Sequence, residues 1–176
     1  YQVEPLGVVV PAHVDDVSTV IEWCSARGLP VLPRGGGTSL AGQTVNTAVV
    51  VDCSAHLRGI GTVDVASRRV HVEPGVVLDE LQQHAAGHGL RFGPDVSTST
   101  HATLGGMIAN RSAVLHSLKW GMTDAHVAGV DVVLASGRRV RLERGAAARD
   151  PVVADLTSRV AQVVLPLADE IDARYP

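Results

Sequence analysis

The sequence predicts an α+β fold of two lobes: a small β-α-β lobe, then a larger lobe with a mixed or antiparallel sheet and helices. Three observations predict it. An apolar run, a helical pattern and a second apolar run follow one another at the start of the chain. Farther along, pairs of short segments with alternating apolar and polar residues flank tight turns, as antiparallel strands do. An amphipathic helical pattern comes last.

The small lobe is expected over residues 1–55. Its opening strand, residues 6–11, reads L-G-V-V-V-P and is closed by proline. Asp15 and Asp16 then offer a helix start, and apolar residues at helical spacing continue to Gly28, a C-terminal cap. The next short apolar strands are residues 30–33 and 48–52, and glycines directly follow the first of them. In open α/β sheets, ligands bind at this carboxyl end of the strands.

The larger lobe is expected over residues 56–176. Residues 61–66 and 69–73 predict a strand pair, because valines alternate with polar residues on both sides of Ser67 and Arg68. An amphipathic helix follows from residue 77 and ends at the glycines of residues 87–89.

The second half of the larger lobe is expected to be irregular at first. Residues 91–123 are dense in Gly, Ser, Thr, Asn and Pro, with one short helix at residues 104–110; such a stretch is uncommon in a compact domain unless it is functional. Residues 127–135 and 139–143 predict a second strand pair. Asp150 and Pro151 open a final amphipathic helix that continues to Leu167.

Composition excludes several classes of protein. The chain has 176 residues, 45% of them hydrophobic, and a formal net charge of -3 without a basic block, so we expect no nucleic-acid partner. No apolar run approaches the roughly 20 residues of a transmembrane helix, and no signal peptide is visible, so we expect no transmembrane segment and a cytoplasmic location. Cys24 and Cys53 lack C-x-x-C spacing and are interpreted as buried free thiols.

Residues 33–43 read P-R-G-G-G-T-S-L-A-G-Q and form the first candidate binding segment. Three successive glycines allow positive φ angles and close approach, so several backbone N–H groups can point at one anion. The competing interpretation is a flexible turn. A Walker phosphate loop is excluded because residues 33–43 contain no lysine. The dinucleotide fingerprint G-x-G-x-x-G fails because Leu40 stands at the position of its third glycine.

Residues 93–110 read G-P-D-V-S-T-S-T-H-A-T-L-G-G-M-I-A-N and form the second candidate segment. Its hydroxyl groups can form hydrogen bonds with phosphate or ribose. Gly105 and Gly106 begin a helix, where unpaired N–H groups are available to an anion. A solvated polar loop would look similar.

Together the two segments resemble those of a known family. The first matches R-G-G-G-T-S-x-x-G-Q, the pyrophosphate loop of the vanillyl-alcohol-oxidase type (PCMH type) of FAD-binding domain among FAD-linked oxidases. The second is similar to its G-P-D-P-(S/A)-T…T-(I/L)-G-G-M-I segment, and residues 130–137 resemble its following strand and turn. The most similar branch contains the bacterial FAD-containing dehydrogenases related to glycolate oxidase and to D-2-hydroxyglutarate or D-lactate dehydrogenase.

The resemblance implies FAD as the cofactor and implies which residues bind it. In the first segment these are Arg34, Gly35, Gly36, Gly37, Thr38, Ser39 and Gln43, with the glycines wrapping the diphosphate and Gln43 supporting the loop. In the second they are Pro94, Asp95, Thr98, Ser99, Thr103, Gly105, Gly106, Asn110 and Ser112.

Two departures from the family pattern matter. Members with covalent flavin often carry histidine where Thr38 stands, so the resemblance implies non-covalent FAD. The branch commonly reads N-N-S-C-G where residues 110–114 read N-R-S-A-V, so Arg111 and Val114 put local flavin contacts in question.

The implied function is oxidation of a 2-hydroxy acid such as lactate, glycolate or 2-hydroxyglutarate by hydride transfer to FAD. Residues 1–176 would be the FAD-binding fragment, with the substrate domain absent, so no catalytic residue is assigned here. An iron–sulfur region or subunit is a possible electron acceptor. Two alternatives stand: an FAD enzyme of the same superfamily acting on a sugar or aldehyde, and a non-catalytic nucleotide- or anion-binding module.

Other candidates are weaker. His84 and His88 have the spacing of a metal pair but lack a third ligand, so a solvated helix face is favoured and no metal is expected. His101 and His116 are interpreted as loop residues that hydrogen-bond locally, with flavin contact as the alternative. Trp120 is expected to anchor the core rather than stack on a ring.

Overall fold

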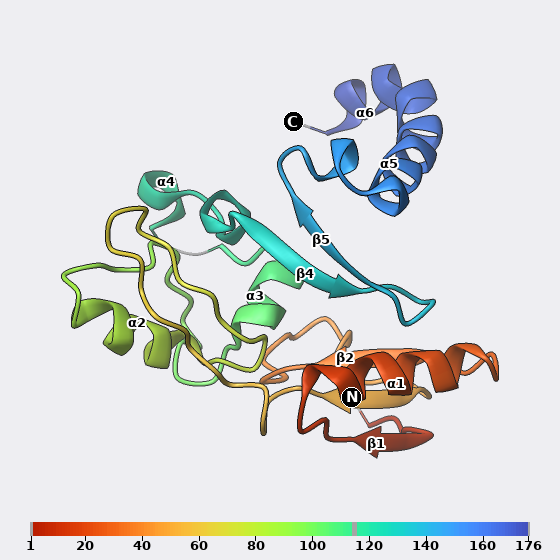
Figure 1. Ribbon diagram of the computed structural model, residues 1–176, viewed down its shortest axis with the longest axis horizontal. Coiled ribbons are helices and arrows are strands. Elements are labelled where there is room, and N and C mark those ends of the chain that lie inside the picture. Colours follow the sequence, from red (N-terminus) through yellow and green to blue (C-terminus); the bar gives the residue numbers. More distant parts are fainter. Residues whose placement is uncertain (1, 114–115, 176) are drawn as a thin grey trace. The chain divides into compact units, whose positions relative to one another are not determined.

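The computed structural model describes residues 2–113 and 116–175 (Figure 1). It divides into two compact units: Tyr1–Val127 with Ala135–Gly137, and Ala128–Leu134 with Arg138–Pro176. The lobe boundary that we expect after residue 55 lies inside the first unit and stays a prediction. Both a parallel and an antiparallel sheet are present, so the α+β fold class is confirmed.

A parallel sheet opens the first unit. Its order is β1 (Gly7–Val9), β3 (Val49–Asp52), β2 (Val31–Arg34), and α1 (Val14–Ser25) connects β1 to β2. The central strand β3 contributes three buried valines, the continuous apolar run that a parallel strand covered on both faces requires. The predicted β-α-β unit is therefore confirmed.

The ends of α1 follow from local chemistry. The carboxylate of Asp16 accepts hydrogen bonds from the backbone N–H groups of Ala12 and His13, 2.9 and 2.8 Å away, which satisfies donors before the first turn. After the helix, Gly28 adopts a left-handed φ of 64°, and the next N–H, on Leu29, returns to the Cys24 carbonyl. Gly28 is thus the predicted terminator.

The main core of the first unit forms around two helices, α2 (Leu78–Ala86) and α3 (Leu104–Ala109). Gln82 on α2 holds the backbone of Phe92 with two hydrogen bonds, through Nε2 to the carbonyl oxygen and through Oε1 to the N–H. The buried side chains of this core are Val76, Leu78, Leu81, Ala102, Leu104 and Met107. Two short helices, α4 (Ser117–Trp120) and η1 (Thr123–His126), complete the unit.

The strand pair expected at residues 61–66 and 69–73 is wrong as regular structure. Only isolated antiparallel bridges join these segments, Ile60 to Val72 and Asp64 to Arg69. The carboxylate of Asp64 accepts from the N–H groups of Ala66 and Ser67 and from the Ser67 hydroxyl, so it organises the tight turn between the two segments. The Ser67 hydrogen bonds lower the pKa of Asp64. The alternating pattern therefore predicted the pairing direction but not continuous strands.

The second unit contains the predicted antiparallel pair, β4 (Gly129–Val133) and β5 (Arg139–Glu143), followed by η2 (Ala146–Ala148), α5 (Pro151–Val164), η3 (Leu165–Leu167) and α6 (Ala168–Arg174). Asp150 caps α5, because its Oδ1 accepts from the Val152 N–H at 2.8 Å and Pro151 stands at the first helical position. The final helix therefore begins where the sequence predicts, and a 3₁₀ turn interrupts it at Pro166.

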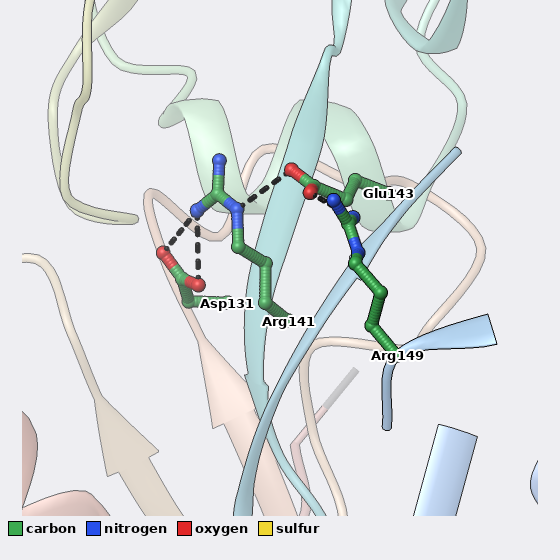
Figure 2. A network of polar contacts seen from close by, with 4 residues as sticks. All are labelled: Asp131, Arg141, Glu143 and Arg149. Carbon is green, nitrogen blue, oxygen red and sulfur yellow. Dashed lines mark hydrogen bonds and ion pairs between the residues drawn. The ribbon is translucent and has the colours of Figure 1, made fainter. Parts of the chain in front are cut away.

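An ion-pair network covers one exposed face of β4 and β5 (Figure 2). Arg141 Nη1 donates to both carboxylate oxygens of Asp131, its cross-strand partner, at 3.0 and 2.9 Å. Arg141 Nε donates to Glu143 at 2.9 Å, and Arg149 pairs with the other oxygen of Glu143. Arg141, and after it Arg149, lowers the pKa of Glu143. The cross-strand pair fixes the register of the hairpin.

One helical stretch among the described residues, Pro151–Arg174, is long and apolar enough to cross a membrane by length and composition alone. Only 6% of its most apolar window is buried. We did not expect such a segment from the sequence. A single helix of this kind is weak evidence for a membrane protein, since signal sequences and core helices meet the same criteria.

Candidate functional site

The glycine loop, residues 35–43, begins directly after β2 and packs against the segment before α3. A Cβ on Gly35 would lie 2.0 Å from Thr103 Oγ1, and a Cβ on Gly36 would lie 2.0 Å from the His101 carbonyl oxygen. Real Cβ atoms essentially never approach this closely, so only glycine allows the two segments to meet. The two candidate segments of the sequence therefore form one site.

The three glycines have different roles. Only Gly37 has a left-handed φ, 66°. Of the two properties that the sequence analysis expects of these glycines, Gly37 uses the positive φ, and Gly35 and Gly36 permit the close approach. The guanidinium of Arg34 lies against Gly37 and donates to the Thr44 carbonyl at 3.4 Å, so Arg34 lies over the loop.

Thr103 carries an unusual polar atom. The residue is only 3% exposed, and its Oγ1 is the one buried side-chain polar atom without a hydrogen-bond partner in the described part of the chain. A buried hydroxyl without a partner costs about 1–3 kcal/mol. This atom lies against Gly35 of the glycine loop.

A small hollow of about 70 Å³, the loop hollow, separates the glycine loop from α3. Nine of the predicted residues line it: Gly35, Gly36, Thr38, Ser39, Thr98, Thr103, Gly106, Asn110 and Ser112. The sequence did not identify its apolar walls, Val96, Ala102 and Met107, because apolar residues in a polar loop have the same pattern as core residues.

A larger hollow of about 310 Å³ borders Gly35 and Gly36 and extends over the sheet residues Val8 and Val50. Arg34 and Asp52 line it from the carboxyl ends of β2 and β3. Asp52 is fixed by Ser54, whose N–H and hydroxyl donate to its Oδ1 at 2.8 and 2.6 Å. No sequence pattern indicated Asp52 or Ser54 as lining residues. Arg34 is the predicted residue found here.

Several predicted cofactor residues are engaged with protein groups. Gly105 packs against Pro74, and its N–H donates to the Pro74 carbonyl at 2.9 Å, so the expected free N–H at this position is wrong. Asp95 accepts a hydrogen bond from His116 Nδ1, which lowers the pKa of Asp95. The cofactor contacts predicted for these residues, and for those that line the two hollows, all stay predictions.

Of the three residues that depart from the family pattern, the structure describes Thr38 and Arg111. Arg111 has a left-handed φ of 47°, and its Nε donates to Asp124 at 3.0 Å. Val114 lies outside the described residues. Thr38, at the position of the covalent histidine, lines the loop hollow.

The weaker candidates resolve as follows. His84 and His88 have ring centroids 5.8 Å apart, and no group of three metal-ligating residues occurs in the described ranges. His101 Nδ1 lies 2.7 Å from the Thr100 hydroxyl. Trp120 is 42% exposed with Lys119 over its ring, so the expected core anchor is wrong; α4 presents the indole to solvent.

The two cysteines are free in the structure. Cys24 is fully buried, as predicted, whereas Cys53 is only half-buried. Burial, and secondarily the Asp52 carboxylate, raises the pKa of the Cys53 thiol.

Comparison with known proteins decides the family. Residues 5–143 match the model of the FAD binding domain family. The chain belongs to this family. Its FAD-binding domain carries FAD as cofactor, and the close-packed glycines and unpaired Thr103 hydroxyl fit a phosphate-bearing ligand.

Curated relatives agree with the branch that the sequence resembles. D-2-hydroxyglutarate dehydrogenase of Escherichia coli is 39% identical over 140 residues, which are 78% of this chain and 14% of that protein. Glycolate oxidase subunit GlcD of Bacillus subtilis is 35% identical over 158 residues, 89% of this chain and 33% of that protein. D-lactate dehydrogenase of Archaeoglobus fulgidus is 35% identical over 139 residues, which are 79% of this chain and 31% of that protein. The chain thus spans a third or less of these relatives.

Solved structures support the fold. 6-Hydroxy-D-nicotine oxidase from Arthrobacter nicotinovorans superimposes with a TM-score of 0.71 at 20% identity, over 81% of this chain and 31% of that one. A glucose dehydrogenase variant of Phl p 4 gives a TM-score of 0.71 at 23% identity, over 80% of this chain and 29% of that one. At such identities the likeness concerns the fold alone.

Proposed function

We propose that this chain is the FAD-binding part of a flavin-dependent dehydrogenase that oxidises a 2-hydroxy acid. The relatives at 35–39% identity are named for D-2-hydroxyglutarate, glycolate and D-lactate, which are all 2-hydroxy acids. The observation that carries the proposal is the joining of the two family segments around the unpaired Thr103 hydroxyl. An oxidised flavin, when bound, supplies the hydride acceptor.

In this proposal, the glycines and the hydroxyl-bearing residues of the loop hollow bind and orient the cofactor's diphosphate. Gly35 and Gly36 allow the backbone to approach the phosphate oxygens, and the hydroxyls of Thr38, Ser39 and Thr103 donate hydrogen bonds to them. These groups act by position, since no acid–base chemistry is assigned to them. Binding of the 2-hydroxy acid and removal of its hydroxyl proton are assigned to residues outside this chain, as is an iron–sulfur electron acceptor.

The cofactor is proposed to be held without a covalent bond. Thr38 stands where covalent relatives carry histidine, and an ordinary threonine hydroxyl does not form such a link. Acid precipitation of the flavin-loaded protein should release the yellow colour into the supernatant. Colour retained in the pellet would contradict the proposal and direct attention to His101 or His116.

The experiment that tests the function has two stages. First, FAD is titrated into the purified chain and followed by flavin fluorescence, with ADP as competitor; saturable binding that ADP weakens is expected. Second, the longest protein encoded by the same gene is assayed for dye reduction with D-lactate, glycolate and D-2-hydroxyglutarate, with glucose as the control substrate. Reduction by glucose but by none of the three acids would overturn the substrate class. Absence of FAD binding would overturn the cofactor role.

A further inference from the structure

Gln43 of the glycine loop bonds to Asn110, which lines the loop hollow. Gln43 Nε2 donates to Asn110 Oδ1 at 2.9 Å, and the two residues are 67 positions apart in the sequence. Gln43 ends the glycine loop, whereas Asn110 is the residue that follows α3. The family pattern implies that Gln43 supports the loop and that Asn110 lines the cofactor site, and the structure pairs the two side chains with one another.

The direction of this hydrogen bond is fixed by a second one. Asn110 Nδ2 donates to the Gly106 carbonyl, one helical turn back, at 2.9 Å. Because that amide nitrogen faces a carbonyl, the other amide atom, Oδ1, must be the acceptor, and Gln43 must present its donor nitrogen. The pair therefore requires an amide donor at position 43, and an acceptor alone would not replace it.

The two sides of the pair differ in rigidity. Asn110 stands on a closed helix end, where the N–H groups of Arg111 and Ser112 return to the carbonyls of Ile108 and Met107 at 3.0 and 2.8 Å. Residues 37–44 have no regular secondary structure. Among the described residues, two side-chain hydrogen bonds connect this segment to the rest of the chain: the bond from Arg34 to the Thr44 carbonyl, and the bond from Gln43 to Asn110.

We propose that the Gln43–Asn110 hydrogen bond is a latch that holds the glycine loop against the end of α3 and sets the width of the loop hollow. Both residues are then positioning residues, and neither contacts the cofactor directly. Both side chains are exposed, and the bond strengthens further when a ligand excludes water from it. This inference rests on the proposed function, since FAD is the ligand used to test it.

The first test is a double-mutant cycle on FAD affinity with Gln43→Met, Asn110→Leu and the double variant. Each single change should raise the Kd for FAD about fivefold, equivalent to one net hydrogen bond of about 1 kcal/mol. The double variant should be no weaker than the weaker single variant, because the second change removes nothing more. Multiplied losses, about 25-fold in the double variant, would mean that each residue contacts the cofactor and would overturn the latch. Gln83→Met, the same change on the exposed side of α2, is the matched control and should leave the Kd unchanged.

The second test needs no cofactor. Backbone NMR order parameters of residues 37–43 should be near 0.85 in the natural chain and fall below about 0.6 in Gln43→Met and in Asn110→Leu, with α2 unchanged. Equal order parameters in all variants would overturn the latch. If the natural chain binds no FAD, the proposed function fails while this measurement still decides the latch.

Discussion

The site around the glycine loop in the first unit and the ion-pair network in the second unit differ in whether their polar side chains have partners within the protein. In the second unit, Arg141 donates to Asp131 and Glu143, and Arg149 also pairs with Glu143, so the charges satisfy one another. In the first unit, Thr103 Oγ1 is buried without any partner. Charged groups that pair with one another stabilise the hairpin itself. A buried hydroxyl without a partner in the protein can still form a hydrogen bond with a ligand.

The largest effect is expected from Gly36→Val. Its Cβ would lie 2.0 Å from the His101 carbonyl, so the backbone of one segment must move and the loop hollow is distorted. We expect the Kd for FAD to rise at least tenfold, about 1.4 kcal/mol, in a fluorescence titration. Gly7→Ala is the control, since a Cβ there meets nothing within 4 Å. Unchanged affinity in a folded Gly36→Val protein would remove the loop from the site.

A smaller effect is expected from Arg141→Met in the ion-pair network. The side chains of Arg141 and Asp131 are half exposed and that of Glu143 is partly exposed, and ion pairs open to water contribute little. The thermal midpoint should fall by a few degrees at most, and the difference from the natural chain should shrink in 1 M salt. The Kd for FAD should not change. A change in FAD affinity would contradict the separation between the structural network and the ligand site.

The smallest effect is a pH dependence in the same network. Arg141 lowers the pKa of Glu143 in the folded protein, so the pairing stabilises the fold above the ordinary pKa of a glutamate, about 4.3. This contribution is lost as the pH falls through the lowered value. Thermal unfolding from pH 6 downward should therefore show the natural chain approaching Arg141→Met in acid. If the thermal midpoints of the natural chain and Arg141→Met differ by the same amount at every pH, the lowered pKa of Glu143 is contradicted.

The regular elements were predictable because their signals are local. Hydrophobic periodicity, Gly28 and the Asp150–Pro151 start identify α1 and α5 without knowledge of the rest of the chain. At residues 61–73 the alternation predicted which segments face each other, but only isolated bridges form there, and the Asp64 side chain holds the turn between them.

The site was predictable in part. The glycines and hydroxyls of the two segments could be identified, and most of them line the loop hollow. Which glycines need close approach depends on residues 101–103, far away in sequence, so the sequence alone does not distinguish their roles. The Gly105 contact with Pro74 and the Gln43–Asn110 bond are likewise tertiary contacts without a local signal.

The most direct test of the account is Thr103→Val, measured for both stability and FAD affinity. Valine keeps the shape of the side chain and removes the hydroxyl that lacks a partner. Without FAD, the free energy of unfolding should stay the same or rise by about 1 kcal/mol, because a buried unsatisfied group is gone. The Kd for FAD should rise about fivefold or more, because the ligand loses its hydrogen bond. A less stable protein with unchanged FAD affinity would contradict the account, since the hydroxyl would then serve the fold and not the cofactor.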